Sequence, residues 1–146
     1  MKNGLCLLID DDEEDHEIFT IAMIQTNPHI DCVAVTSGAA AVEKLRNDPD
    51  FIPDIIFLDM DMPGLNGKQT LVELRKIDRL DHVPIIILST FEDEGFVAET
   101  KKLGSIGYVV KPTSIRELTK TLTWVLESPF LKENHFFCPR NPFSLF

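Results

Sequence analysis

The chain has 146 residues and a formal net charge of -10 at pH 7, from 24 Asp and Glu against 14 Lys and Arg. This length fits one domain that can bury a core without disulfide or metal staples. The acidic balance excludes binding to nucleic-acid phosphates and to anionic membranes, which need a basic surface, and favours cations and protein partners.

Five short aliphatic runs have the composition of strands that are buried on both faces of a sheet. They cover residues 5–9, 30–35, 55–58, 85–88 and 108–110. Segments of helical period follow them at residues 14–26, 39–47, 68–77, 92–103 and 115–127. Because parallel neighbours need long right-handed crossovers, this alternation predicts a (βα)5 α/β fold, a doubly wound parallel five-stranded sheet with helices on both faces.

Residues at the ends of the helical segments agree with this division. Ser114 and Glu117 have capping-box spacing before the last helix, and Gly104 suits the end of the fourth. Pro28 is expected to end the first helix, since the residue before a proline disfavours helical backbone.

The cysteines and the amino terminus indicate the compartment. Cys6, Cys32 and Cys138 are odd in number and widely spaced, so they predict neither a disulfide framework nor a zinc site. The opening apolar run is too short for a signal peptide, and no apolar stretch approaches membrane-spanning length. We therefore expect a soluble, unprocessed cytoplasmic protein.

Polar residues whose side chains could take part in catalysis or metal binding follow four of the predicted strands. They are Asp10 and Asp11 after the first, Asp59 and Asp61 after the third, Ser89 and Thr90 after the fourth, and Lys111 after the fifth. In parallel sheets these carboxyl ends meet at one edge, where ligands bind. Carboxylates that converge there repel one another unless a cation lies among them, and oxygen ligands favour Mg²⁺, or Mn²⁺ in its place. A carboxylate beside Mg²⁺, a lysine and a hydroxyl can attack phosphorus and hold an aspartyl phosphate.

The motifs LLIDD, FLDMDMPGLNG, IIILST and YVVKP occur in this order along the chain. Over residues 3–127 the chain resembles a receiver domain of two-component response regulators. The resemblance implies a flavodoxin-like fold with strand order 2-1-3-4-5, whose first and third strands flank the switch point.

The resemblance also implies roles for individual residues. Asp59 would be the phosphoacceptor and Lys111 would pair with the phosphoryl group. Asp10, Asp11 and Asp59, with the backbone carbonyl of Asp61, would hold the metal.

Ser89 would be the switch hydroxyl, and Tyr108 the aromatic residue whose rotamer follows its movement. The bond from Lys111 to Pro112 is expected to be cis, as is common in this family.

Three features depart from the family pattern. Asp61 adds a carboxyl two residues after the acceptor, and Thr90 replaces the usual alanine or glycine, so we expect both to modulate phosphoryl lifetime. The loop at residues 47–54 is longer than typical, which is expected to change only the surface.

The remaining acidic residues of the first helix have a simpler interpretation. Glu13, Glu14, Asp15 and Glu17 are typical of solvated carboxylates that favour the helix dipole at its amino terminus.

The favoured function is a signalling switch. A histidine kinase or histidine phosphotransfer protein would phosphorylate Asp59, and the changed surface would bind an unknown downstream protein. Such a domain is no enzyme beyond its own phosphorylation and dephosphorylation.

Two alternatives remain. Asp59 and Asp61 form a DxD, as in phosphatases with an aspartyl nucleophile, although Pro63 departs from that motif and no cap domain fits. A degenerate receiver could serve as a scaffold, although such domains usually lose the acceptor, the lysine or an acidic-pair member.

The expected organisation is a receiver domain at residues 1–127 and an extension at residues 128–146, with no output domain. The extension holds five of the ten phenylalanines and three prolines. Aromatic side chains gain by leaving water, so we expect it to be ordered, docking on its own domain or on a partner or second copy. Its prolines are expected to keep it non-helical.

Overall fold

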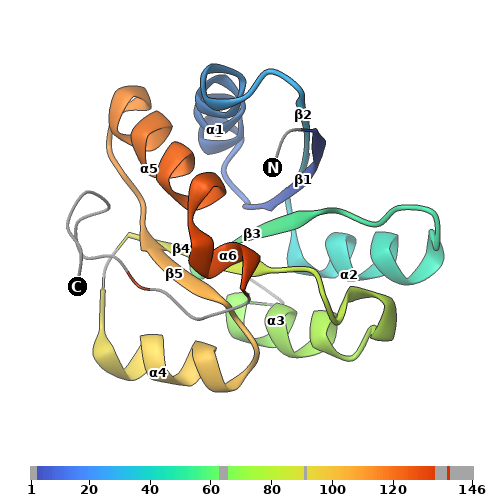
Figure 1. The fold of residues 1–146 in the computed structure, drawn as a ribbon. Coiled ribbons are helices and arrows are strands. Elements are labelled where there is room, and N and C mark those ends of the chain that lie inside the picture. The colour runs from blue at the N-terminus through green and yellow to red at the C-terminus, as the bar shows by residue number, and fades with distance from the viewer. Residues whose placement is uncertain (1–2, 63–65, 91, 134–137, 139–146) are drawn as a thin grey trace.

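The computed structural model describes residues 3–62, 66–90, 92–133 and 138. Five parallel strands form one sheet in the order β2-β1-β3-β4-β5 (Figure 1). The strands are β1 (Gly4–Ile9), β2 (Ile30–Val35), β3 (Ile55–Asp59), β4 (Ile85–Ser89) and β5 (Gly107–Val110). The predicted fold class and strand order are confirmed.

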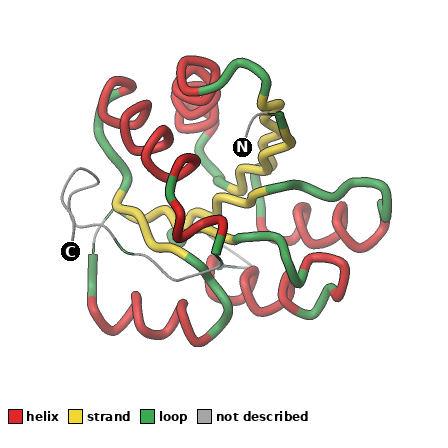
Figure 2. Tube along the Cα trace, viewed as in Figure 1, coloured by secondary structure: helices red, strands yellow, loops and turns green. Residues whose placement is uncertain are grey.

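A helix follows each strand, and the alternation of strand and helix can be followed along the tube in Figure 2. The helices are α1 (Glu13–Thr26), α2 (Gly38–Asn47), α3 (Gly67–Arg75), α4 (Glu94–Lys102) and α5 (Ile115–Glu127), with a 3-10 turn η1 (Asp78–Leu80) and a short α6 (Pro129–Lys132). Among the described residues, no helix combines the length and apolarity that a membrane crossing needs.

The core consists of two apolar clusters, one on each face of the sheet. In β3, Ile55 and Phe57 join the cluster beneath α1 and α5, whereas Ile56 and Leu58 join the cluster beneath α2 and α3. Side chains alternate between faces along a strand, so a sheet covered on both faces needs continuous apolar runs. This requirement explains why the strands can be recognised in the sequence as continuous apolar runs.

Hydrogen bonds at the helix ends define where the helices begin. The Ser114 hydroxyl accepts from the Glu117 amide at 3.1 Å, as its spacing predicts. Gly104, just beyond α4, has a φ of 109°, a left-handed conformation that favours glycine. A reciprocal capping box occurs at Asn66 and Gln69, at the start of α3.

Two expectations are wrong. Residues 129–132 form α6, because a proline is tolerated at the first helical position, where the amide needs no partner. The described residues contain no cis peptide bond, so Lys111 precedes a trans Pro112, the isomer that X-Pro bonds favour by about 0.5–1 kcal/mol.

The described part of the extension contacts the domain itself. Ser128 is buried and Leu131 packs against the α1/α5 cluster. Cys138 packs against the cluster on the opposite face, and its thiol donates to a carboxylate oxygen of Glu92 at 3.3 Å. The side chain of Phe130 and the phenylalanines at 136, 137, 143 and 146 lie outside the described residues, so the expectation about them stays a prediction.

Candidate functional site

The carboxyl ends of four strands bring the predicted site residues to one edge of the sheet. Asp10 follows β1, Asp59 ends β3, Ser89 ends β4 and Lys111 follows β5. Asp10, Asp59 and Ser89 are at most 3% exposed. Because β1 and β3 are neighbours at the centre of the sheet, Asp10 and Asp59 meet where the strand order reverses.

Three carboxylates form a cluster at this point. Asp10, Asp11 and Asp59 each offer an oxygen, and these oxygens lie within 4.8 Å of one another. Burial raises the pKa of Asp59 to about 6, and the charge of Asp10 adds to this rise against the opposing effect of Lys111. Two buried carboxylates and one exposed one therefore share a small volume that favours a positive ion.

The Lys111 ammonium supplies positive charge at the cluster. Its Nζ lies 2.8 Å from Asp10 Oδ2, 3.0 Å from Asp15 Oδ2 and 3.3 Å from Asp59 Oδ1. Burial alone would lower the pKa of Lys111, but the hydrogen bonds to Asp10 and Asp15 and the nearby charges raise it above its ordinary value. The side chain is therefore charged at neutral pH.

The loop after β1 fixes the position of Asp10. Asp10 Oδ1 accepts from the Asp12 amide at 3.0 Å, and the Asp10 carbonyl accepts from the His16 ring. Asp12 in turn caps α1, with its Oδ1 accepting from the Glu14 amide at 2.9 Å. The buried carboxylate thus has little freedom to turn away from Asp59.

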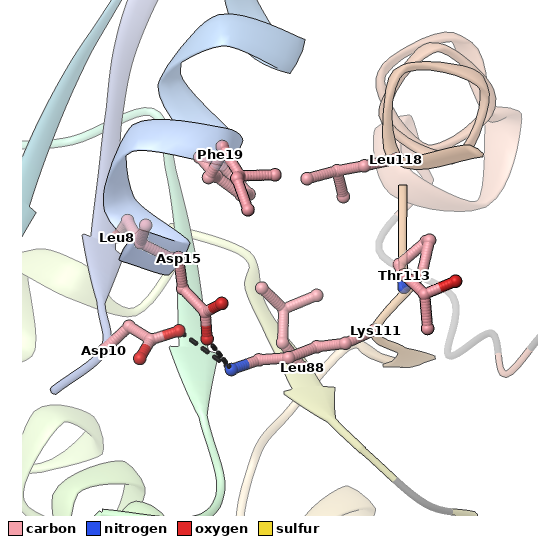
Figure 3. Close-up of a pocket in the computed structure, with 10 residues that line it drawn as sticks. Leu8, Asp10, Asp15, Phe19, Leu88, Lys111, Thr113 and Leu118 are labelled. Carbon is pink, nitrogen blue, oxygen red and sulfur yellow. Dashed lines mark hydrogen bonds and ion pairs between the residues drawn. The ribbon is translucent and has the colours of Figure 1, made fainter. Parts of the chain in front are cut away.

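The prediction that the acidic residues at the start of the first helix are all solvated is wrong for Asp15. Glu13, Glu14 and Glu17 are exposed as expected, but Asp15 is half-buried and forms an ion pair with Lys111 (Figure 3). It lies four residues before the buried Phe19, so both point to the same face of α1. That spacing is the sequence signal that could have placed Asp15 in the site.

Ser89 and Tyr108 lie on the neighbouring strands β4 and β5, and both side chains are buried. The Ser89 carbonyl accepts from the Lys111 amide at 2.7 Å, and the Ser89 side chain hydrogen-bonds that of Tyr108. Burial raises the pKa of the Tyr108 hydroxyl, partly offset by this hydrogen bond. A displacement of the Ser89 hydroxyl would therefore break a contact of Tyr108.

Asp61 and Thr90 lie at the exposed mouth of the site. The Asp61 amide donates to Asp59 Oδ1 at 3.2 Å, which ties the backbone of Asp61 to the Asp59 carboxylate. The Thr90 hydroxyl donates to Asp61 Oδ2 at 3.3 Å. The two residues that depart from the family pattern are therefore connected to each other.

The sequence profile of the response regulator receiver domain family matches residues 6–123. The chain belongs to this family. It is 31% identical to Protein PilH of Pseudomonas aeruginosa over 120 residues, which cover 82% of this chain and 96% of PilH. It is 33% identical over 108 residues to a protein-glutamate methylesterase/protein-glutamine glutaminase of Burkholderia thailandensis, covering 73% of this chain but 29% of that longer protein.

Solved structures of response regulators share the fold. The phosphorylated cyanobacterial phytochrome response regulator RcpA matches with a TM-score of 0.76 and 24% identity, over 86% of this chain and 92% of RcpA. The Mn²⁺-bound form of Rcp1 matches with a TM-score of 0.74 and 22% identity, over 88% of this chain and 95% of Rcp1. These two likenesses concern the fold of the receiver.

Proposed function

We propose that the protein is a phosphorylated signalling switch, in which Asp59 takes a phosphoryl group from a phosphohistidine donor. An Asp59 carboxylate oxygen attacks phosphorus, the phosphorus–nitrogen bond to the donor imidazole breaks, and the electron pair leaves with that imidazole, which takes up a proton. The observation that carries the proposal is the buried Asp59 carboxylate held beside both a lysine ammonium and two further carboxylates.

The donor set fits Mg²⁺, with Mn²⁺ as a substitute. Asp10, Asp11 and Asp59 offer hard oxygen ligands that lie within 4.8 Å of one another, and oxygen ligands of this kind favour Mg²⁺. We assign these three side chains and the Asp61 carbonyl as ligands. A bound ion would supply charge neutralisation to the phosphoryl oxygens.

The other residues of the site have proposed roles of their own. Lys111 binds a phosphoryl oxygen, since its Nζ lies 3.3 Å from the carboxylate that accepts the group. Ser89 moves toward the phosphoryl group and Tyr108 follows, because their hydroxyls are in contact before any phosphorylation. The resulting surface changes affinity for a downstream protein.

Partners follow from this chemistry. A histidine kinase or a histidine phosphotransfer protein would supply the phosphoryl group, and the acidic chain would contact no nucleic acid or membrane through this site. Membership of the response regulator receiver domain family supports a place in two-component signalling.

The test compares wild type, Asp59→Asn and Asp61→Asn with acetyl phosphate or a phosphorylated kinase, with and without Mg²⁺. We expect Mg²⁺-dependent incorporation of one phosphoryl group in wild type and Asp61→Asn, and none in Asp59→Asn. Equal, Mg²⁺-independent labelling of all three would refute the assignment.

A generic aryl phosphate separates the switch from the DxD phosphatase. We expect no turnover above background, whereas sustained multiple turnover that is lost in both aspartate variants would favour the phosphatase. Failure of Mg²⁺ binding and phosphorylation together would favour the scaffold.

A further inference from the structure

Asp15 differs from the other carboxylates around Lys111 in one respect. Lys111 contacts Asp10, Asp15 and Asp59, and two of these, Asp10 and Asp59, belong to the three-carboxylate cluster. Asp15 lies on α1 and does not belong to that cluster. It is therefore the contact of Lys111 that a cation in the cluster would leave in place.

The surroundings of Lys111 restrict where its ammonium can go. The side chain lines a pocket of ≈ 250 Å³ between α1 and α5, whose apolar wall includes Leu8, Leu88 and Leu118 (Figure 3). Only 17% of the Lys111 side chain is exposed. An ammonium cannot point into apolar surroundings without a large desolvation cost, so it stays at the carboxylate end of the pocket.

The Asp15 carboxylate is built into the fold at this place. Phe19, one helical turn further along α1, is buried in the core and fixes the rotation of the helix. The Asp15 side chain is 39% exposed, against 1% for Asp10, so it keeps part of its hydration while it accepts from Lys111 at 3.0 Å.

We infer that Asp15 is a positioning residue that holds the Lys111 ammonium on the α1 side of the site, so that Lys111 competes less with a divalent cation for Asp10 and Asp59. The inference rests on the proposed function for the use of the cation and of Lys111. Without Asp15, both remaining carboxylate partners of Lys111 are members of the cation cluster. Lys111 then has to be displaced from one of them for each ion that binds.

The experiment is a Mg²⁺ titration of unphosphorylated protein, followed by isothermal titration calorimetry. We expect Asp15→Asn to weaken Mg²⁺ binding about three- to tenfold. Glu14→Gln is the matched control, because it removes the same charge from the neighbouring, exposed position of the same helical turn. We expect this control to change the affinity by less than about twofold.

Variants at Lys111 distinguish a positioning role of Asp15 from a simple effect of its negative charge. In a Lys111→Met background, Asp15→Asn should have no larger effect than Glu14→Gln, and Asp15→Glu in the otherwise native chain should restore most of the affinity. If Asp15→Asn matches Glu14→Gln in the native background, or keeps its full effect without Lys111, the inference is wrong.

A second measurement keeps the two proposals distinguishable. If wild type binds no Mg²⁺, the proposed cation site fails, and the inference is then tested by urea unfolding of Asp15→Asn, Lys111→Met and the double variant. Shifts of the unfolding midpoint that are non-additive support the Asp15–Lys111 pairing, and additive shifts overturn it.

Discussion

The Asp59 carboxylate is almost fully buried, and this makes the stability of the fold depend on pH. Its pKa is raised, chiefly by burial, from 3.8 to about 6. The folded state therefore binds this proton more tightly than the unfolded state between those two pH values. The contribution of Asp59 to stability is most favourable below pH 4 and is lost as pH rises through 6.

Asp59→Asn should consequently stabilise the protein near neutral pH in the absence of divalent ions. We expect a gain in the free energy of unfolding on the order of 1–3 kcal/mol near pH 7, shrinking toward zero near pH 4. Urea unfolding in EDTA at both pH values measures it, with the exposed Asp61→Asn as the control. A gain that is the same at both pH values would contradict this account.

Under the proposed function, we expect Thr90 and Asp61 to affect the lifetime of a phosphoryl group on Asp59. The Thr90 side chain adds bulk beside the site and its hydroxyl donates to Asp61 at 3.3 Å, so a water molecule has less room for in-line attack. We expect Thr90→Ala to shorten the half-life of phosphorylated protein by roughly two- to tenfold. Thr90→Ser keeps the hydroxyl and should lie between the two. An unchanged or longer half-life in Thr90→Ala would show that Thr90 is no gate.

The sequence was sufficient to predict those site residues that lie at the ends of strands. Asp10, Asp59, Ser89 and Lys111 follow apolar runs, and parallel strands must end at one edge, so the order of runs was enough to bring these residues together. The contact of Asp15 depends instead on the rotation of α1 about its axis. That helix also carries Ile18, Ile21 and Ile24, which are exposed, so its apolar pattern does not show which face is buried.

At the scale of elements, the start of α3 packs closely against the end of β3. A Cβ added to Gly67 would lie 2.6 Å from Met60 Cα and 2.8 Å from the Asp59 carbonyl oxygen. Both atoms belong to the backbone and cannot turn aside. The glycine therefore lets α3 approach the segment that carries Asp59.

Gly67→Ala should destabilise the protein by about 1–3 kcal/mol, although the same change in an unconstrained helix is stabilising. Gly95→Ala in α4 is the control, because its new methyl group would meet a flexible carboxylate oxygen of Asp93 at 3.0 Å. Thermal melts of both variants measure the difference. Equal melting temperatures would mean that α3 can move away at no cost.

The elements themselves were predictable because each is long enough to show its period. The limits of α5 match the expected ones, and α4 begins two residues later than expected because the Asp93 side chain caps it at the Phe96 amide. The turn η1 and the helix α6 have three and four residues, too few to show a period, so sequence patterns could not reveal them.

For the whole molecule, the open question is what the C-terminal extension contributes. Its described residues contact both apolar clusters, with Leu131 on the α1/α5 face and Cys138 on the opposite face. β5 is an edge strand of the sheet, and the described residues of the extension contact the apolar clusters on both faces of that sheet. Exposed edges promote association, and covering them is a known protection.

Truncation after Glu127 should therefore lower the melting temperature while the protein remains monomeric. Loss of Leu131 and of the Cys138 contact removes apolar burial of roughly 1–3 kcal/mol, which corresponds to a shift of a few degrees. Truncation after Glu133 keeps α6 and isolates the contribution of the segment that contains Cys138. Calorimetry gives the melting temperature, and light scattering gives the molar mass. Unchanged stability, solubility and mass in both truncations would show that the extension is not ordered on the domain, whereas a native dimer that becomes monomeric on truncation would show that it docks on a second copy.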